Sequence, residues 1–184
     1  MSSNSEDILS VSEVVLFGSH KAYRRLVDKY QSPVRRFFLL HTDYNRELSD
    51  DLSQETFIRC WEKIATFRGI SSFSTWLYTI AYHILSDHFR RQKECCTLQD
   101  EYPDKIYESS DDTERKHDIQ KALRVLSHDE RVCATLFYLD DMTIAKITKI
   151  TGMPSGTIKS HLSRARVKLG DFLKDQGYET GHHK

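Results

Sequence analysis

The feature that most constrains the fold is an apolar stripe of helical period in residues 73–89. Apolar side chains recur there at steps of three and four, as expected for one buried face of an α-helix. The stripe consists of Phe73, Trp76, Leu77, Ile80, Ala81, Ile84, Leu85 and Phe89. Ser71 or Ser72 is the expected N-cap, because a hydroxyl there can accept a hydrogen bond from an otherwise unpaired backbone N–H. The pattern predicts an amphipathic helix that runs to about residue 93.

The same predicted helix carries aromatic and basic residues away from the stripe. These residues are Tyr78, Tyr82, His83, Arg90, Arg91 and Lys93. Aromatic rings stack on unpaired bases and cations hold phosphates, so this face fits single-stranded nucleic acid. An ordinary amphipathic helix with a solvated basic end accounts for the same residues, and it is the better interpretation of this helix taken alone.

A further helix is predicted directly before it, in residues 49–65, with a short loop between the two. Ser49 is the expected N-cap, and Asp50 and Asp51 would lie in the first turn, where the helix dipole favours anions. The expected inward residues are Leu52, Thr56, Phe57, Cys60, Trp61, Ile64 and Ala65. Gly69 gives the loop a residue that can take a backbone conformation that other residues resist.

The last third of the chain has the pattern of a helix-turn-helix. Residues 127–130 read Ser-His-Asp-Glu, a capping box that starts one helix. A short helix is predicted at residues 143–150, followed by a tight turn in which Gly152 adopts a positive φ. The last helix, residues 155–174, has the inward stripe Ile158, Leu162, Ala165, Leu169 and Phe172. Because that helix carries five cations against one anion, the unit is typical of domains that bind duplex DNA.

The formal net charge is zero, but charge is segregated along the chain. Residues 94–118 carry nine acids, three bases and almost no periodicity, which predicts a flexible acidic linker between two domains. Charge of this kind keeps a segment solvated; a sharper alternative is that it imitates nucleic acid in a basic channel of a partner. Residues 1–18 are expected to form a loose start that leads into a short apolar piece at residues 11–17. A helix that Pro33 bends or interrupts is expected at residues 19–40.

Several classes of site lack their usual residues. The cysteines (Cys60, Cys95, Cys96 and Cys133) have no metal-ligand spacing, and the nine histidines are scattered. Neither a nucleophile–base pair nor a phosphate-binding loop is found, so we expect no catalytic residue, metal, cofactor or small-molecule substrate. No apolar run is long enough to span a bilayer and no signal peptide is visible, which favours a reduced, cytoplasmic setting.

Two blocks of the sequence match a known pattern. The first block contains Asp51-Leu-Ser-Gln-Glu-Thr-Phe-Ile-Arg-Cys-Trp61, Phe67-Arg-Gly69, Phe73-Ser-Thr-Trp-Leu-Tyr-Thr-Ile-Ala81 and Asp87-His-Phe-Arg-Arg91. The second contains Leu126-Ser-His-Asp-Glu-Arg131 and Gly152-Met-Pro-Ser-Gly-Thr-Ile-Lys-Ser-His-Leu-Ser-Arg-Ala-Arg166. In this order, with an acidic segment between them, they resemble regions 2 and 4 of the extracytoplasmic-function (ECF) sigma factors. These are the small initiation subunits of bacterial RNA polymerase.

The resemblance implies an all-α fold of two small helical domains joined by a flexible acidic linker. It places a region 2 domain at residues 1–93, the linker at residues 94–118, and a region 4 helix-turn-helix domain at residues 119–184. It implies no enzyme, but a subunit that binds core RNA polymerase, recognises promoter DNA and helps open it. An anti-sigma factor is a further partner that the resemblance allows. The expected location is the cytoplasm, with the polymerase on the nucleoid.

The resemblance also implies three sets of contact residues. The set for the clamp of the core polymerase is Asp51, Gln54, Glu55 and Trp61, with the tryptophan packed behind the other three. The set for the melted minus-ten promoter element is Phe67, Arg68, Gly69, Ser72, Tyr78, Tyr82, His83, Arg90 and Arg91. The set for the minus-thirty-five duplex is Ser155, Thr157, Lys159, Ser160, His161, Arg164 and Arg166. Base-side positions in this last set are Lys159, Ser160 and Arg164, while Ser155, Thr157 and Arg166 suit phosphates.

The chain departs from the family pattern at a few positions. His161 and Ser163 stand where larger basic or aromatic residues are frequent, so the base preference of relatives does not transfer to this chain. Lys146 and Lys149 stand where acids are usual, in the helix before the turn.

Three other functions compete with this interpretation. A sigma mimic that only titrates an anti-sigma factor would lack DNA-facing cations, whereas Arg90, Arg91, Lys159 and Arg164 are present. An ordinary helix-turn-helix regulator with a ligand-sensing first domain leaves the block at residues 51–61 unexplained. An all-helical enzyme lacks any visible catalytic constellation.

Overall fold

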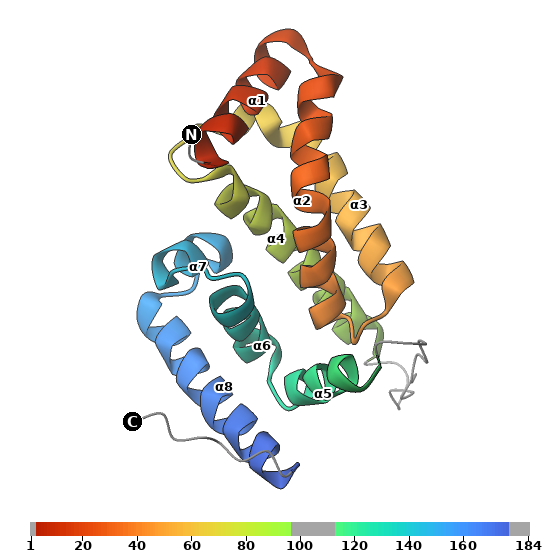
Figure 1. Cartoon of the computed structure of the whole chain (residues 1–184), viewed down its shortest axis with the longest axis vertical. Helices are drawn as coiled ribbons and strands as arrows, with labels where there is room; N and C mark the ends of the chain where they lie inside the picture. Colours follow the sequence, from red (N-terminus) through yellow and green to blue (C-terminus); the bar gives the residue numbers. More distant parts are fainter. Residues whose placement is uncertain (1–2, 97–112, 177–184) are drawn as a thin grey trace. The chain divides into compact units, whose positions relative to one another are not determined.

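The computed structural model describes residues 3–96 and 113–176, and all of their regular structure is helical (Figure 1). The α-helices are α1 Ser3–Phe17, α2 His20–His41, α3 Arg46–Lys63, α4 Phe73–Cys96, α5 Thr113–Arg124, α6 His128–Ala134, α7 Ile144–Thr151 and α8 Ser155–Asp175. A 3-10 turn, Ile64–Thr66, follows α3, and a π-helical turn, Thr135–Leu139, follows α6. The predicted all-α class is confirmed.

The described residues form two compact units. The first contains α1, α2 up to Phe38, α3 and α4. The second contains Leu39–Asn45 and the helices from α5 to α8. Both ends of the predicted linker are helical, since α4 continues to Cys96 and α5 begins at Thr113. The sequence has neither proline nor glycine between Arg91 and Cys96 that would stop α4. Residues 97–112 of the predicted linker lie outside the described residues.

The core of the first unit is built around α4. Its buried residues are Phe73, Thr75, Leu77, Tyr78, Ile80, Ala81, Ile84 and Leu85. Most of the predicted stripe is therefore confirmed, while Trp76 and Phe89 are only partly buried. α2 packs on α4 through aromatic rings, as in the edge-on contact of Phe37 with Tyr78, whose ring centroids are 5.6 Å apart. Pro33 lies inside α2, which remains helical on both sides of it.

The N-terminal segment forms helix α1, although the sequence predicted a loose start. Asp7 explains the difference, because its side chain is tied to α2. This residue is only 3% exposed; its carboxylate accepts a 2.6 Å hydrogen bond from the Tyr30 hydroxyl and pairs with Lys29. Val11 and Val14 are buried too. Burial and the neighbouring Asp7 raise the pKa of Tyr30, which keeps this hydroxyl protonated as a donor.

Helix α3 begins at Arg46, one turn earlier than predicted. Ser49 is therefore not an N-cap; it lies inside the helix and is fully buried. Asp50 and the aspartate after it lie beyond the first turn. The usual start signals occur one turn upstream, because Asn45 directly precedes the helix and Glu47 lies in its first turn.

The second unit contains the predicted helix-turn-helix, formed by α7 and α8. The Thr143 hydroxyl caps α7 by accepting a hydrogen bond from the Lys146 backbone N–H at 3.3 Å, and Gly152 ends the helix with a φ of 74°. The capping box predicted at residues 127–130 is confirmed at the start of α6. The buried apolar residues of these helices and of the π-helical turn include Leu136, Ile147, Ile150, Ile158, Leu162 and Ala165.

We predict that Asp7→Ala destabilises the first unit by about 1–3 kcal/mol, because it leaves the buried Tyr30 hydroxyl without its acceptor. Both tryptophans of the chain, Trp61 and Trp76, belong to this unit, so tryptophan fluorescence during urea unfolding isolates its transition. The matched control is Asp28→Ala, which removes an exposed ion pair with Arg24 and should change stability little. Equal effects of the two substitutions would show that Asp7 does not fix α1.

Candidate nucleic-acid interface

The loop between α3 and α4 presents an apolar side chain on a fixed frame. Ser72 caps α4 by accepting a hydrogen bond from the Thr75 backbone N–H at 3.2 Å, which decides between the two predicted caps. Gly69 has a φ of 68°, as predicted for the loop. The Phe67 ring is partly buried, and it contacts the rings of Phe73 and Trp76 with centroids 5.7 Å apart in each case.

Ile70 lies in the same loop and is 81% exposed, the highest value among the large apolar side chains of the described residues. Arg68, two residues before it, is exposed as well. Sequence reasoning identified the loop but not this isoleucine, because no periodicity distinguishes an exposed loop residue from a buried one. An exposed apolar tip next to a cation is suited to contact an unstacked base.

The exposed face of α4 carries fewer of the predicted residues than expected. Tyr78 is only 3% exposed and packs in the core, so its assignment to the exposed face is wrong. Tyr78 lies beside Leu77 and one and two turns before Ala81 and Leu85, so it belongs to the edge of the buried stripe. Helix α2 covers α4 widely enough to bury this edge as well. Tyr82 is partly buried next to the exposed His83, with ring centroids 5.9 Å apart.

Arg90 and Arg91 near the end of α4 are exposed, as predicted, while the predicted Lys93 side chain lies outside the described ones. Arg90 donates a 3.1 Å hydrogen bond to the Asp87 carboxylate one turn earlier, which offsets part of its charge. Arg91 is exposed. The pKa of His88 is lowered by the burial of its own ring and by the nearby positive charge of Arg91. A positive local potential of this kind attracts phosphate.

The polar face of α3 holds the residues predicted for protein contact. Asp51 and Gln54 are exposed three residues apart, and so share one side of the helix. Glu55 is partly buried and forms a 2.5 Å ion pair with Arg59. Trp61 is partly buried and stacks on the His20 ring of α2, at 4.9 Å between centroids and with an interplanar angle of 14°.

The first turns of α8 expose a row of polar and basic side chains. Exposed members of the predicted set are Ser155, Thr157, Lys159, Ser160, Arg164 and Arg166, while His161 is partly buried. The Ser160 hydroxyl donates a 3.0 Å hydrogen bond to the Gly156 carbonyl within the helix. Among the residues that the structure describes, Lys159 and Arg166 have no ion-pair partner. Their full charge is therefore available to a polyanion.

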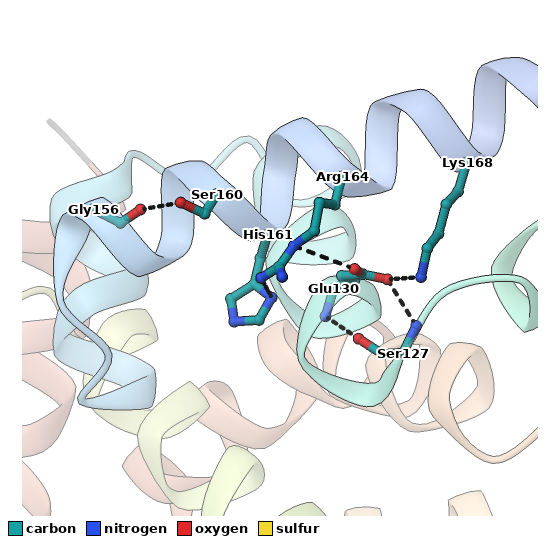
Figure 2. A network of polar contacts seen from close by, with 7 residues as sticks. All are labelled: Ser127, Glu130, Gly156, Ser160, His161, Arg164 and Lys168. Atoms are coloured by element: carbon teal, nitrogen blue, oxygen red, sulfur yellow. Dashed lines mark hydrogen bonds and ion pairs between the residues drawn. The ribbon is translucent and has the colours of Figure 1, made fainter.

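A buried carboxylate lies beneath the middle of α8, as Figure 2 shows. Glu130 of α6 is only 4% exposed. Its carboxylate accepts hydrogen bonds from the Lys168 ammonium at 2.7 Å and from the Ser127 backbone N–H at 3.0 Å. One carboxylate oxygen also lies 3.6 Å from Arg164 Nε, and Arg164 Nη2 lies 3.2 Å from His161 Nδ1. A network thus joins the capping box to two cations of α8.

The Glu130 carboxylate remains ionised in this network. Burial alone would raise its pKa, but the hydrogen bonds from Lys168 and from the Ser127 backbone outweigh it, and the net shift is downward. The sequence identified Glu130 as the second half of a capping box, but gave no sign of its contacts with α8. Those contacts join Glu130 to residues 34 and 38 positions further along the chain, and local pattern carries no such information.

The described residues were also compared with the requirements of a metal site, a membrane-spanning helix and a reactive cysteine. Within them no group of three histidine, cysteine or acidic side chains is placed to hold a metal ion. None of their helices combines the length and apolar character that crossing a bilayer requires. Cys60 and Cys133 are buried, as predicted, and burial raises the pKa of their thiols to about 11 and about 12. Both therefore stay protonated at neutral pH.

Comparisons with known proteins support the resemblance of the two sequence blocks to sigma regions 2 and 4. Residues 26–95 match the family model of Sigma-70 region 2, and residues 116–169 match that of Sigma-70, region 4. The ECF RNA polymerase sigma factor EcfG of Rhodopseudomonas palustris (strain TIE-1) is 30% identical over 150 residues, which cover 80% of this chain and 83% of that protein. The ECF RNA polymerase sigma factor SigW of Bacillus subtilis (strain 168) is 28% identical, with 86% and 92% covered.

A solved structure shows the same likeness in three dimensions. The sigma factor RpoE of Bartonella quintana, solved in complex with the anti-sigma factor NepR, superposes with a TM-score of 0.73 at 25% sequence identity. The match covers 84% of this chain and 98% of that one.

Proposed function

The chain belongs to the ECF RNA polymerase sigma factors, and we propose that its exposed residues divide promoter recognition between the two units. As a member of this family it is a non-enzymatic subunit for transcription initiation, which binds RNA polymerase and DNA. The observation that carries the proposal is the placement of exposed cations on α8 and of an exposed apolar loop before α4. The first suits duplex DNA and the second suits unpaired bases.

The duplex contact is assigned to the first half of α8. Lys159, Ser160 and Arg164 are the proposed base-side residues, with His161 between them. Ser155 and Thr157 lie in the first turn, where backbone N–H groups and the helix dipole favour a phosphate. Arg166, exposed and without an ion-pair partner in the described residues, adds a phosphate contact on the flank. Two exposed cations on one helix thereby have different roles.

We predict that Arg164→Ala reduces discrimination between promoter variants by about 1–3 kcal/mol, because it removes a base-reading cation. Arg166→Ala is the matched control on the same helix. It should weaken binding to all sequences alike and lower the salt slope by about 1. Both are measured by competition of the reconstituted holoenzyme for a promoter library with a randomised upstream element. Unchanged preferences in Arg164→Ala would remove this residue from the base-reading set.

Contact with the melted strand is assigned to the loop after α3 and to α4. Extruding a base from the stack costs a few kcal/mol, which the protein must offset with stacking and apolar contact. The proposed residues are Phe67, Arg68, Gly69, Ile70, Ser72, Tyr82, His83, Arg90 and Arg91. Ile70 is available for that contact, whereas the buried Tyr78 supports α4 from within the core.

We predict that Ile70→Ser lowers the extent of promoter melting several-fold at unchanged stability, because an exposed loop side chain contributes little to folding. The measurement is permanganate footprinting of unpaired thymines with the reconstituted holoenzyme. Leu16→Ser is the control, since Leu16 is another apolar residue with high exposure, 71%, on α1. Equal melting by both variants and the parent would exclude Ile70 from the base-contacting loop.

Binding of the core polymerase is assigned to the exposed face of α3. Asp51 and Gln54 are the outermost of the proposed residues, and they present carboxylate and amide oxygens on one side of the helix. Glu55 has its charge partly offset by Arg59, and Trp61 stabilises the face from behind. An anionic face of this kind is complementary to a cationic surface.

We predict that Asp51→Lys weakens association with core polymerase, because it places a cation against a cationic partner. The effect should reach about tenfold in Kd and should fall as salt rises. Asp28→Lys on α2 makes the same change in net charge away from α3. Fluorescence titration of labelled core with each variant separates the two outcomes. Equal weakening by both would point to net charge rather than to this face.

The partners of relatives extend the proposal. Because RpoE of Bartonella quintana was solved with the anti-sigma factor NepR, an anti-sigma factor is a proposed regulator of this chain as well. A location in the cytoplasm, with polymerase on the nucleoid, is part of the same proposal.

A further inference from the structure

We propose that Glu130 is a positioning residue for promoter discrimination, which sets the direction in which Arg164 meets duplex DNA. The inference rests on the proposed base-reading role of Arg164. Glu130 itself belongs to α6 and is buried, so it acts through α8 rather than by touching DNA.

Arg164 has a polar contact on each of two sides. Its Nε lies 3.6 Å from a Glu130 carboxylate oxygen, and its Nη2 lies 3.2 Å from His161 Nδ1 (Figure 2). The carboxylate is itself held by the Ser127 backbone N–H at 3.0 Å and by the Lys168 ammonium at 2.7 Å. An immobile anion therefore defines where one edge of the guanidinium points. The Arg164 side chain nevertheless remains 59% exposed, so its outer edge can still reach a ligand.

The negative charge goes beyond what the helix cap requires. A glutamine at the same position closes a capping box equally well, because the box needs only an acceptor for the N-cap N–H. The additional property of a glutamate is its charge, and two cations of α8 lie against it. That charge has a role that the cap alone does not explain.

The charge of Glu130 acts on DNA binding in two ways. A free arginine can turn to any nearby phosphate, whereas one held against a fixed carboxylate presents its remaining donors in one direction, as bidentate contact with a base requires. The carboxylate also offsets the charges of Arg164 and Lys168, which would otherwise increase attraction to every sequence. Only the defined approach of Arg164 changes the difference in affinity between sequences, whereas the offset charge weakens binding to all of them alike.

The test compares the parent with Glu130→Gln, which keeps the cap and removes the charge. Full-length protein is assembled with bacterial core polymerase and allowed to compete for a promoter library randomised in the upstream element. We expect the preference for the best sequences over the library mean to fall about tenfold. Binding to a non-promoter duplex should become tighter, and its salt slope should steepen by about 1 to 2 as cations are released.

Two further variants separate positioning from stability. Ser127→Ala removes the other half of the capping box without changing charge, so it should lower the stability of the second unit and leave the preferences unchanged. In an Arg164→Ala background, Glu130→Gln should no longer change the preferences, because the arginine that it orients is absent. The freed Lys168 charge should still tighten binding to all sequences alike. Additive effects of Glu130→Gln and Arg164→Ala would overturn the inference.

The remaining outcomes are also decisive. If Arg164→Ala leaves the preferences intact, the proposed reading by α8 fails and this inference fails with it. If Arg164→Ala changes them while Glu130→Gln does not, the duplex contact stands and Glu130 is only a helix cap. If Ser127→Ala alters the preferences as much as Glu130→Gln does, the effect comes from the cap and not from the charge.

Discussion

A chain with 27 cationic and 27 anionic residues can bind a polyanion only if some of its cations are not neutralised within the protein. The ion pairs among the described residues show which cations are neutralised within the protein. Several cations form ion pairs with carboxylates of the same chain, among them Arg25, Arg35, Arg59 and Lys168. By contrast, the exposed Lys159 and Arg166 of α8 have no ion-pair partner among the described residues. A chain of zero net charge thereby presents a locally basic helix.

The groups proposed to meet DNA lie on elements whose ends are fixed. The loop after α3 is bounded by the Ser72 cap and by the packing of the Phe67 ring, so Ile70 is exposed on a rigid frame rather than on a free tip. In the helix-turn-helix, Gly152 takes the left-handed conformation that lets α7 end and α8 begin after a short turn. Contacts that must discriminate between bases need this rigidity, because a small displacement changes which atoms meet.

Local sequence signals predicted the parts of the structure that depend on neighbours along the chain. The stripe of α4, the capping box before α6 and the positive φ of Gly69 and Gly152 follow from side chains within one or two turns. The sequence misplaced features that depend on distant residues. Asp7 orders α1 through residues 22 and 23 positions away, and the width of the stripe that buries Tyr78 depends on α2. Periodicity gives the centre of a buried face but not its edges.

The cluster around Glu130 is better explained by the orientation that it gives to Arg164 than by a contribution to the stability of the fold. Taking a carboxylate out of water costs several kcal/mol. Attraction to nearby cations offsets much of this cost only if the carboxylate also makes good hydrogen bonds. Apolar residues at these positions would hold α6 and α8 together at least as well, but they would leave a guanidinium free to rotate. A fixed anion instead constrains the orientation of Arg164 while leaving part of its surface open. The arrangement therefore connects the start of α6 to the side of α8 where bases would be distinguished.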